Sequence, residues 1–402
     1  MADEYLPRDT LSLWWLGDPA HPQRIGDIQL VQGGRGVGLR YDAAWRSQGF
    51  ALSADLPLVD ELFVPTHKDT AVGALDDARP DRWGERVIRK FQPTPRLSLL
   101  EYLLFAGDDR YGALGVSPDP DIYRPWTSGP LPGFDQLEAM ADAVRRVLAN
   151  EPVPELQRRL VRPGASLGGA RPKSLLQMDG RAWLVKFNED DELDTPLIEH
   201  AAMTLARCAG IDVAETRPLP LPQGHAVAIG RFDRQGPWRL HAMSAHVALR
   251  AAGEVLGYPE FAQQLRRLLP AADISAWQAQ WFRRMVFNIL IDNTDDHEKN
   301  HALLRSPQGR WSLAPAFDVL PTAQGLGYQQ LHVGEAGTES TLANALSGAA
   351  QFGLKPAAAR EVVREICAVV DGWVPHFRAC GVREAEIEHL ARFINRQAVR
   401  RL

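Results

Sequence analysis

The sequence predicts an α+β fold, with a mixed α/β first part and an all-helical second part. Two observations lead to this division. Short strand-like segments separated by turns dominate the chain up to about residue 245, and beyond it apolar residues recur at helical spacing. We expect three domains: a β-rich subdomain over residues 1–130, an α/β part over 131–245 and a helical part over 246–402. A length of 402 residues is enough for two or three domains.

The bulk composition narrows the class of protein. Hydrophobic residues make up 45% of the chain, which allows a substantial core, and the net charge of −5 gives no sign of a nucleic-acid binder. The three cysteines (Cys208, Cys367 and Cys380) lie far apart and form no CxxC pair. This pattern is typical of a reduced cytoplasmic protein and argues against a disulfide framework or a zinc site. We also expect no secretory signal and no membrane span, because no apolar run is long enough.

In the first hundred residues, two segments read as strands of a small sheet: "LSLWWLG" (11–17) and "GVGLRYD" (36–42). The segment "DDARPDRWGERVIRKF" (76–91) reads as a turn followed by a helix. A further helix is predicted over residues 134–149, with apolar residues at helical spacing, and the Pro-rich segment 118–133 before it is a plausible linker.

A β-hairpin is predicted over residues 173–187, because Asp179-Gly180 between two apolar runs tolerates positive φ at both turn positions. A two-residue turn there places Lys173 opposite Lys186. Like charges directly opposite are unfavourable unless an anion lies nearby. The alternatives are a register shifted by one residue, or two lysines that point to water. A helix over 197–210, ended by Gly210, and a strand over 225–234 are expected to follow.

The second part is predicted to be helical. A long helix starts near Asp273 and presents Ile274, Trp277, Trp281, Met285 and Ile289 on one face. Segments 356–370 and 383–400 are expected to be amphipathic helices, the last one ending in a cluster of arginines that suits a helix C-terminus.

A glycine-rich segment, "GASLGGARPK" (164–173), leads directly into the first strand of the hairpin. Glycines let backbone N–H groups approach a phosphate closely, so this segment is a candidate phosphate-binding loop. It matches neither of the common phosphate-loop patterns, and a simple flexible loop remains the alternative.

The stretch "NILIDNTDDHEKNHALL" (288–304) places strongly polar residues between two apolar runs. Asp295 and Asn300 have the D-x-x-x-x-N spacing of a protein-kinase catalytic loop, in which the aspartate faces the acceptor hydroxyl and the asparagine holds metal. Two short strands around Ser306–Gly309 would bring Asp318, within the apolar segment "LAPAFDVLP", back towards these residues. This order of parts predicts a two-lobed, protein-kinase-like fold and a phosphotransferase. A bare D-x-x-x-x-N could otherwise be a solvated loop.

Taken together, these motifs resemble the HipA family, the serine/threonine kinase toxins of bacterial type II toxin–antitoxin systems. The resemblance spans roughly residues 10–400 and keeps the family's order throughout. The pieces that carry it are "DDARPDRWG" (76–84), "YGALGVSPD" (111–119), "SLGGARPKSLL" (166–176), "WLVKF" (183–187), "RFDR" (231–234), "TDDHEKNHALL" (294–304) and "PAFDVLPT" (315–322).

The resemblance implies a role for each motif. Asp295 would orient or deprotonate the acceptor hydroxyl, and Asn300 and Asp318 would hold Mg²⁺. Ser166 would be autophosphorylated, adding about two negative charges where the ATP phosphates must lie. The residues implied in nucleotide binding are Gly168, Gly169, Ala170, Lys173, Lys186, Arg231, Phe232 and His297, the last with a role that could equally be structural.

Three positions depart from the family pattern or leave a choice open. Asp296 stands where the family usually has glycine, and its carboxylate could bind a second cation or face solvent. Gly230 stands where the family often has an acid, so nucleotide contacts there would come from the backbone. Glu199 could pair with Lys186, as in kinases, or could be a surface glutamate.

Three functions fit these residues. The first is an ATP- and Mg²⁺-dependent protein kinase that acts as a toxin on a cellular protein; targets in the family include aminoacyl-tRNA synthetases. The second is a small-molecule phosphotransferase. The third is a non-catalytic co-repressor scaffold that binds a small helix-turn-helix antitoxin of HipB type. The sequence contains no convincing DNA-binding helix-turn-helix of its own, so contact with DNA would come through that partner.

Overall fold

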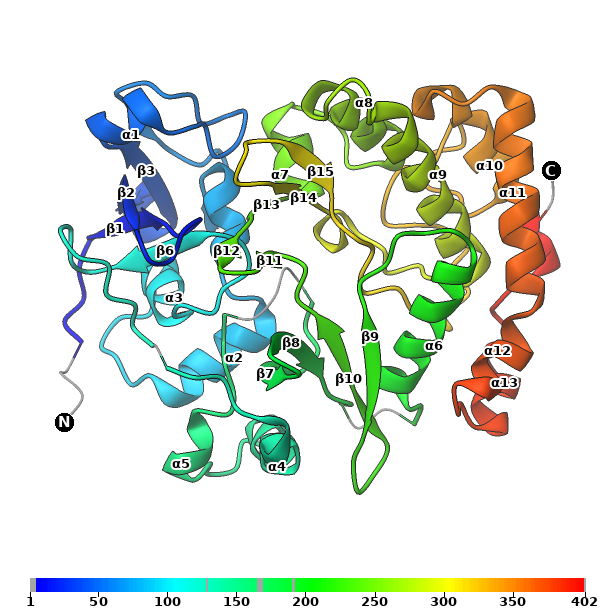
Figure 1. Ribbon diagram of the computed structural model, residues 1–402, viewed down its shortest axis with the longest axis horizontal. Helices are drawn as coiled ribbons and strands as arrows, with labels where there is room; N and C mark the ends of the chain where they lie inside the picture. The colour runs from blue at the N-terminus through cyan, green and yellow to red at the C-terminus, as the bar shows by residue number, and fades with distance from the viewer. Residues whose placement is uncertain (1–4, 128, 165–168, 190–191, 401–402) are drawn as a thin grey trace. The chain divides into compact units, whose positions relative to one another are not determined.

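A computed structural model describes residues 5–127, 129–164, 169–189 and 192–400, and its helices and strands form an α+β fold (Figure 1). The contacts within the chain define two units. Unit 1 contains the residues up to Phe187 together with Asp233–Val247 and Leu304–Gln308, and unit 2 contains the remainder. Each unit thus takes its residues from several separate segments. The three domains predicted from the sequence follow other boundaries and stay a prediction.

Unit 1 contains an antiparallel sheet in the order β4-β3-β2-β1-β6, with β5 parallel to β3 (Figure 1, blue and cyan). The segments predicted as strands at 11–17 and 36–42 are β1 and β3, so this expectation is confirmed. Alternating residues such as Leu11, Leu13 and Leu39 are fully buried on this sheet. The strands are β1 (Thr10–Trp15), β2 (Gln23–Val31), β3 (Gly36–Tyr41), β4 (Leu62–Phe63), β5 (Thr70–Ala71) and β6 (Leu114–Ser117).

Two helices of unit 1, α2 and α3, begin at side-chain caps. Asp81 accepts a hydrogen bond from the Gly84 amide at the start of α2, and Ser98 and Glu101 form a capping box at the start of α3. The helices predicted within 76–91 and 134–149 are confirmed as α2 and α4. The helices are α1 (Ala43–Gln48), α2 (Arg82–Phe91), α3 (Leu99–Phe105), α4 (Leu137–Leu148) and α5 (Glu155–Arg158).

The predicted hairpin is present in unit 1 as β7 (Lys173–Met178) and β8 (Arg181–Lys186). Asp179 and Gly180 both have positive φ, at 52° and 71°, as the two-residue turn requires. Lys173 pairs with Lys186, so the register derived from the sequence is confirmed. The later strands of this unit are β11 (Arg234–Gln235), β12 (Trp238–Arg239) and β13 (His241–Ser244).

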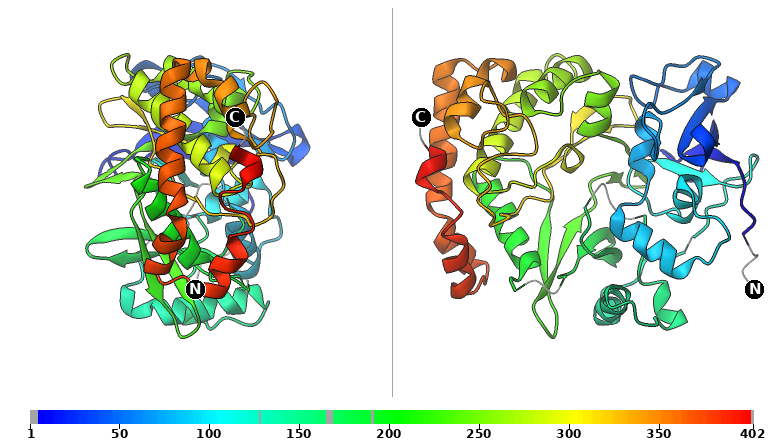
Figure 2. Two further views of the ribbon diagram at one scale, coloured as in Figure 1. Left: turned by 90° about the vertical axis from the view of Figure 1, so that its right-hand side faces the viewer. Right: turned by 180° about the vertical axis from the view of Figure 1, so that it is seen from behind.

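Unit 2 is built around the long helix α9 (Ile274–Leu290), which packs against α8 (Tyr258–Leu268) and α11 (Pro356–Asp371). The apolar face predicted for α9 buries Trp281, Met285 and Ile289. The strands of this unit are β9 (Thr216–Pro220), β10 (His225–Gly230) and β15 (Trp311–Leu313). The other helices are α6 (Thr195–Cys208), α10 (Leu342–Ser347), α12 (Trp373–Ala379) and α13 (Glu384–Leu390), and Figure 2 shows α11 and α12 following each other along one side of the unit.

Two short elements cross the boundary between the units along the chain: α7 (Ala245–Ala251) and β14 (Ala302–Arg305). β14 and β15 are the two short strands expected around Ser306–Gly309. Among the helices of the described ranges, none is long and apolar enough to cross a membrane.

One predicted helix is much shorter than expected. The sequence predicted a helix over residues 383–400, but α13 ends at Leu390. Asn395 adopts a left-handed conformation with φ of 61°, and its amide donates to the Leu290 carbonyl. This turn lets Arg396 donate to the Asp292 carboxylate at 2.9 Å. A tertiary ion pair, not a helix end, therefore accounts for this member of the arginine cluster.

Candidate active site

The loop that follows α9 contains the predicted catalytic and metal-binding pair, both in unit 2. Asp295 is exposed at a turn, whereas Asn300 is 3% exposed and ends a short 3-10 helix over Glu298–Asn300. The Asn300 Nδ2 atom lies 3.5 Å from the Asp295 backbone carbonyl oxygen, so the loop folds back on itself over the five-residue spacing. The sequence thus predicted correctly that these two residues lie close together.

The side-chain oxygen of Asn300 is the polar atom of this loop that best suits coordination of a metal ion. Oδ1 is buried and has no hydrogen-bond partner among the residues that the structure describes. A buried, unsatisfied carbonyl oxygen is costly, and the amide oxygen of asparagine is a good ligand for hard cations. The donor set of Asn300 and Asp318 therefore fits Mg²⁺, which usually takes one or two protein oxygens and completes its shell with water and phosphate oxygens.

Asp318 is joined to this loop on both sides by hydrogen bonds within unit 2. Upstream of Asp318, the Ala314 amide donates to the Ala302 carbonyl at 2.8 Å, two residues after Asn300. Downstream, the hydroxyl oxygens of Thr322 and Thr294 lie 2.6 Å apart, and Thr294 immediately precedes Asp295. The hairpin return proposed from the sequence is therefore present.

The backbone at Asp318 is unusual. Its φ is +58°, a left-handed conformation that costs most residues about 1 kcal/mol or more and that aspartate tolerates better than most. The preceding Phe317 ring lies against Phe232, with centroids 5.5 Å apart. Phe232 of the "RFDR" motif is therefore placed beside the Asp318 segment, and Arg231 before it is half-buried.

Asp292 organises the start of the loop, and sequence reasoning did not single it out. It is 1% exposed and also has positive φ, at 58°. Its carboxylate accepts hydrogen bonds from the Gln324 and Gly325 amides and from Arg396. Burial raises the pKa of Asp292, and these donors oppose that rise. In the sequence, a single carboxylate directly after the run "NILI" could have indicated a buried acid that needs partners.

Asp296, the extra carboxylate beside Asp295, does not face solvent, because it is 1% exposed. Its Oδ2 atom accepts hydrogen bonds from the Tyr258 hydroxyl and from Nε2 of His301. The sequence-based alternative of a solvent-facing group is therefore wrong. His297, one residue further, accepts a hydrogen bond from the Lys299 amide through Nδ1 and so caps the 3-10 turn, in line with a structural role.

The glycine-rich segment lies in unit 1 and is described only in part. Ser166 and Gly168 fall outside the described residues. Gly169 has φ of +95°, and a Cβ atom there would lie 2.9 Å from Nζ of Lys173. Glycine at this position therefore allows both the backbone conformation and the close approach of the lysine. Ala170 follows directly and is exposed.

The two lysines of the hairpin are both buried, Lys173 at 2% and Lys186 at 6% exposure. The Lys173 ammonium group lies 2.7 Å from the Asp81 carboxylate. The negative charge expected beside the two facing lysines is thus supplied within the protein, by Asp81. The alternative in which both lysines point to water is wrong.

The N-terminus of α2 packs against the start of the hairpin and the segment before the glycine-rich loop. From the sequence, this region was known only through the resemblance of "DDARPDRWG" to the family. Trp83 donates from Nε1 to the Lys173 carbonyl at 2.8 Å. A Cβ on Gly84 would lie 2.1 Å from the Pro163 carbonyl oxygen, so only glycine allows α2 to pack this closely on the segment before the glycine-rich loop. In the sequence, the combination of a capping aspartate, a tryptophan and a glycine could have indicated this packing.

The second half of "RFDR" ties together two motifs of unit 1. Asp233 is fully buried and accepts hydrogen bonds from the Gly112 amide at 2.8 Å and from Arg234. Arg234 also donates to the carbonyls of Gly112 and Arg110. These contacts explain why "RFDR" and "YGALG" occur together. In unit 2, Glu199 on α6 is 1% exposed, so the alternative of a surface glutamate is wrong.

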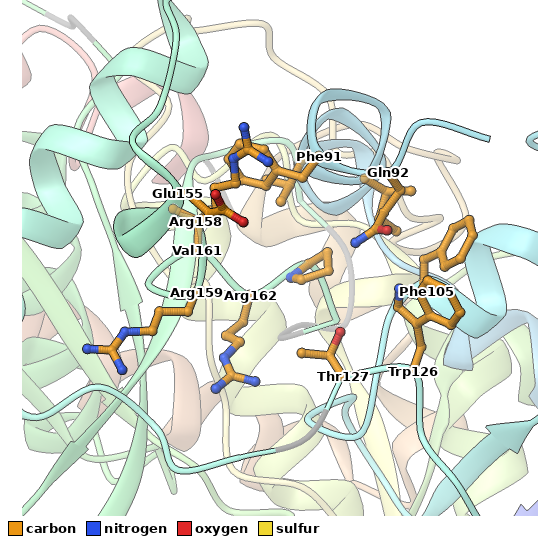
Figure 3. A pocket seen from close by; sticks show the side chains of 13 residues that line it. Phe91, Gln92, Phe105, Trp126, Thr127, Glu155, Arg158, Arg159, Val161 and Arg162 are labelled. Carbon is orange, nitrogen blue, oxygen red and sulfur yellow. The ribbon is translucent and has the colours of Figure 1, made fainter. Parts of the chain in front are cut away.

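Unit 1 also contains a cavity of about 590 Å³, lined in part by the segment that precedes the glycine-rich loop (Figure 3). Phe91, Phe105 and Trp126 form part of its wall. Two of its charged groups have partners: Arg162 pairs with Asp109, and Arg158 lies over the ring of Phe91. The cavity contains none of the residues predicted to carry phosphoryl transfer. Over the described ranges, moreover, no three His, Cys, Asp or Glu side chains are grouped as a metal cluster.

Comparisons with known proteins agree with the motifs. The model of the HipA-like C-terminal domain matches residues 165–373, and that of the HipA N-terminal domain matches residues 20–117. Together these matches cover most of the chain, with both domains in the family's order. The chain therefore belongs to the HipA family.

Two relatives come from Sinorhizobium fredii. The protein named Putative kinase Y4dM is 32% identical over 271 residues, which is 62% of this chain and 60% of that protein. The match thus spans less than two thirds of that relative. The protein named Putative kinase Y4mE is 28% identical over 340 residues, covering 78% of this chain and 77% of that protein.

Among solved structures, the chain is similar to HipA of Shewanella oneidensis MR-1, determined as a complex of HipA, HipB and operator DNA. The TM-score is 0.67 with 18% identity, over 95% of this chain and 94% of that one. This similarity shows the fold, and the kinase-like α+β class predicted from the sequence is confirmed.

Proposed function

We propose that this protein is an ATP- and Mg²⁺-dependent serine/threonine protein kinase of the HipA type. The observation that carries the proposal is the loop of residues 292–300, in which exposed Asp295 lies beside buried Asn300, whose Oδ1 lacks a partner among the described residues. A carboxylate accessible to a substrate next to a dehydrated amide oxygen is what phosphoryl transfer requires. Membership of the family and two relatives named as kinases support the same conclusion.

In the proposed reaction, an acceptor hydroxyl oxygen forms a bond to the γ-phosphorus of ATP. The bond from that phosphorus to the β–γ bridging oxygen breaks, and ADP leaves. Asp295 orients the hydroxyl and receives its proton. Asn300 and Asp318 would hold Mg²⁺, which neutralises charge on the phosphates when bound. Lys186, with Lys173 nearby, would contact the phosphates from the hairpin, together with Gly168, Gly169 and Ala170.

The proposed acceptor within the chain is Ser166, and the proposed external substrate is a cellular protein. The test is incubation of the purified chain with ATP labelled at the γ-phosphate and Mg²⁺, followed by mapping of the label. We expect label on Ser166 in the native chain and none in Asp295→Ala. Glu361→Ala removes an exposed carboxylate of α11 in the same unit and is the matched control that keeps the label.

A second candidate function is a scaffold that binds a small helix-turn-helix antitoxin of HipB type. The HipA of Shewanella oneidensis, which has the same fold, was determined with HipB and operator DNA. Unlabelled protein that binds nucleotide normally, and that co-purifies with such a partner and its DNA, would favour the scaffold. Label transferred to a small amine or sugar would favour a small-molecule phosphotransferase instead.

A further inference from the structure

Asp296 is held in a buried polar cluster next to the proposed catalytic residue. Its Oδ2 atom accepts hydrogen bonds from the Tyr258 hydroxyl and from Nε2 of His301, the latter at 2.8 Å. All three residues are at most 2% exposed. Burial, and then the Asp296 carboxylate, raise the pKa of Tyr258 well above its usual value of 10, so the phenol keeps the proton that it donates. With two donors on one oxygen, Asp296 acts as the acceptor at the centre of the cluster.

This cluster is anchored in the helical core of unit 2. Tyr258 is the first residue of α8, and its backbone carbonyl accepts a hydrogen bond from Nε1 of Trp281 in α9 at 2.7 Å. Its hydroxyl also accepts a hydrogen bond from Asn288 of α9 at 3.3 Å. The ring of His301 meets the Trp281 ring edge-on, with centroids 4.4 Å apart. The groups that bind Asp296 therefore cannot move without disturbing two packed helices.

The cluster fixes both ends of the loop that contains the proposed catalytic and metal-binding residues. Asp296 directly follows Asp295, and His301 directly follows Asn300. One hydrogen bond between Asp296 and His301 thus closes the segment between them. The Asp296 side chain is buried and Asp295 is exposed. Of the two adjacent carboxylates, only that of Asp295 is therefore accessible.

We propose that Asp296, Tyr258 and His301 form a buried clamp that positions Asp295 and Asn300 for phosphoryl transfer, so that Asp296 is a positioning residue. This inference rests on the proposed kinase function. It assigns a role to the carboxylate that directly follows the proposed catalytic Asp295. A clamp holds the loop in one geometry, and misplacement of a reacting group by about 1 Å can cost about a hundredfold in rate.

The test compares variants of the clamp in the full chain. Tyr258→Phe removes one donor to Asp296, Asp296→Asn keeps an acceptor oxygen, and Asp296→Ala removes the side chain. We measure the maximal rate of autophosphorylation and the ATP concentration at half-maximal rate. Tyr258→Phe is expected to lower the maximal rate about tenfold or more with less than about a twofold change in half-saturating ATP. Asp296→Asn is expected to recover part of the rate that Asp296→Ala loses.

Asn344→Ala is the matched control for general destabilisation. Asn344 is 3% exposed and donates to the carbonyls of Gly337 and Glu339, so it is a buried polar anchor in the same unit. At a similar loss in melting temperature, we expect its maximal rate to stay within about twofold of the native rate. An equal loss of rate in Asn344→Ala and Tyr258→Phe would overturn the clamp.

Hydrogen exchange separates failure of the clamp from failure of the proposed function. The backbone amides of residues 293–300 are expected to exchange faster in Tyr258→Phe than in Asn344→Ala, whether or not the chain transfers phosphate. An inactive native chain with this difference in exchange would reject the kinase and retain the clamp as a structural device. Unchanged exchange of residues 293–300 in Tyr258→Phe and Asp296→Ala would reject the clamp, whatever the activity.

Discussion

The hydroxyl oxygens of Thr294 and Thr322 lie 2.6 Å apart, and Thr322 also donates to the Asp292 carbonyl at 2.7 Å. These bonds join the loop that contains Asp295 to the segment that follows Asp318. The two stretches are far apart in the sequence, and this bridge is what makes a shared site for their carboxylates physically reasonable.

Thr322→Val removes the bridging hydroxyl and keeps the shape of the side chain. Because the carbonyl of buried Asp292 and the hydroxyl of Thr294 each lose a partner, we expect the free energy of unfolding to fall by about 1–3 kcal/mol, measured by urea titration. Thr70→Val is the matched control: Thr70, at the start of β5 in unit 1, also donates to a backbone carbonyl, but this bond is exposed, and its cost should be smaller. Equal costs in the two variants would mean that the bridge contributes no special stability.

Asn300→Ala and Asn300→Asp test whether Oδ1 is a metal ligand. We expect Asn300→Ala to weaken binding of Mg²⁺–ADP by about tenfold or more, equivalent to about 1.4 kcal/mol, while Asn300→Asp, which keeps an oxygen, binds more tightly than the alanine variant. Isothermal titration calorimetry with and without Mg²⁺ measures the effect. Equal weakening of ADP binding in EDTA would contradict a role in holding the metal.

The buried Lys173–Asp81 pair makes a prediction for stability. Either Asp81→Asn or Lys173→Met leaves a buried charge without the opposite charge that lies 2.7 Å from it, so each alone should cost about 3–5 kcal/mol in the free energy of unfolding. The double variant should recover much of that loss. Chemical denaturation of the four proteins gives the coupling energy, and additive losses would show that the two groups do not depend on each other.

The same variants test the proposed phosphate contact of Lys173. If Lys173 also binds nucleotide, Lys173→Met should weaken ATP binding at fixed Mg²⁺, whereas Asp81→Asn, which keeps the ammonium group, should not. Weakening by both variants to the same extent would indicate that the pair only supports the fold of this corner.

His241 makes stability depend on pH. It is 1% exposed, its Nε2 contacts the Leu52 carbonyl, and burial lowers its pKa from 6.5 to about 4. Between these values the unfolded chain binds the proton and the folded chain does not, so the free energy of unfolding rises with pH. The contribution is fully present above about pH 6.5 and is lost as pH falls to about 4, by about 3 kcal/mol in all.

His241→Gln keeps an N–H donor for the Leu52 carbonyl but cannot titrate in this range. The difference in unfolding free energy between the native chain and this variant should therefore change with pH between about 4 and 6.5, in favour of the variant at low pH. Urea titrations at intervals across that range measure it. A difference that stays constant with pH would contradict the assignment.

Local sequence determined much of this protein. Asp179-Gly180 sets its own turn, and that turn alone fixes the pairing of Lys173 with Lys186. The five-residue spacing of Asp295 and Asn300 is short enough for the Asn300 amide to reach the Asp295 carbonyl, so their closeness could be read from the sequence. Helices α2, α4, α9 and α11 follow from apolar periodicity, with the Asp81 cap added at α2, because each depends on interactions within a few residues of the chain.

Only the tertiary structure decided which polar groups are buried and what they bind. Asp292 pairs with Arg396, 104 residues away, where local patterns predicted only a helix. Lys173 pairs with Asp81, 92 residues away, where local patterns predicted an anion without identifying it. Likewise, two adjacent aspartates look alike in sequence, yet Asp296 is buried and Asp295 exposed. The physical reason is that the stability of a buried charge depends on partners brought by other helices, and no local pattern encodes them.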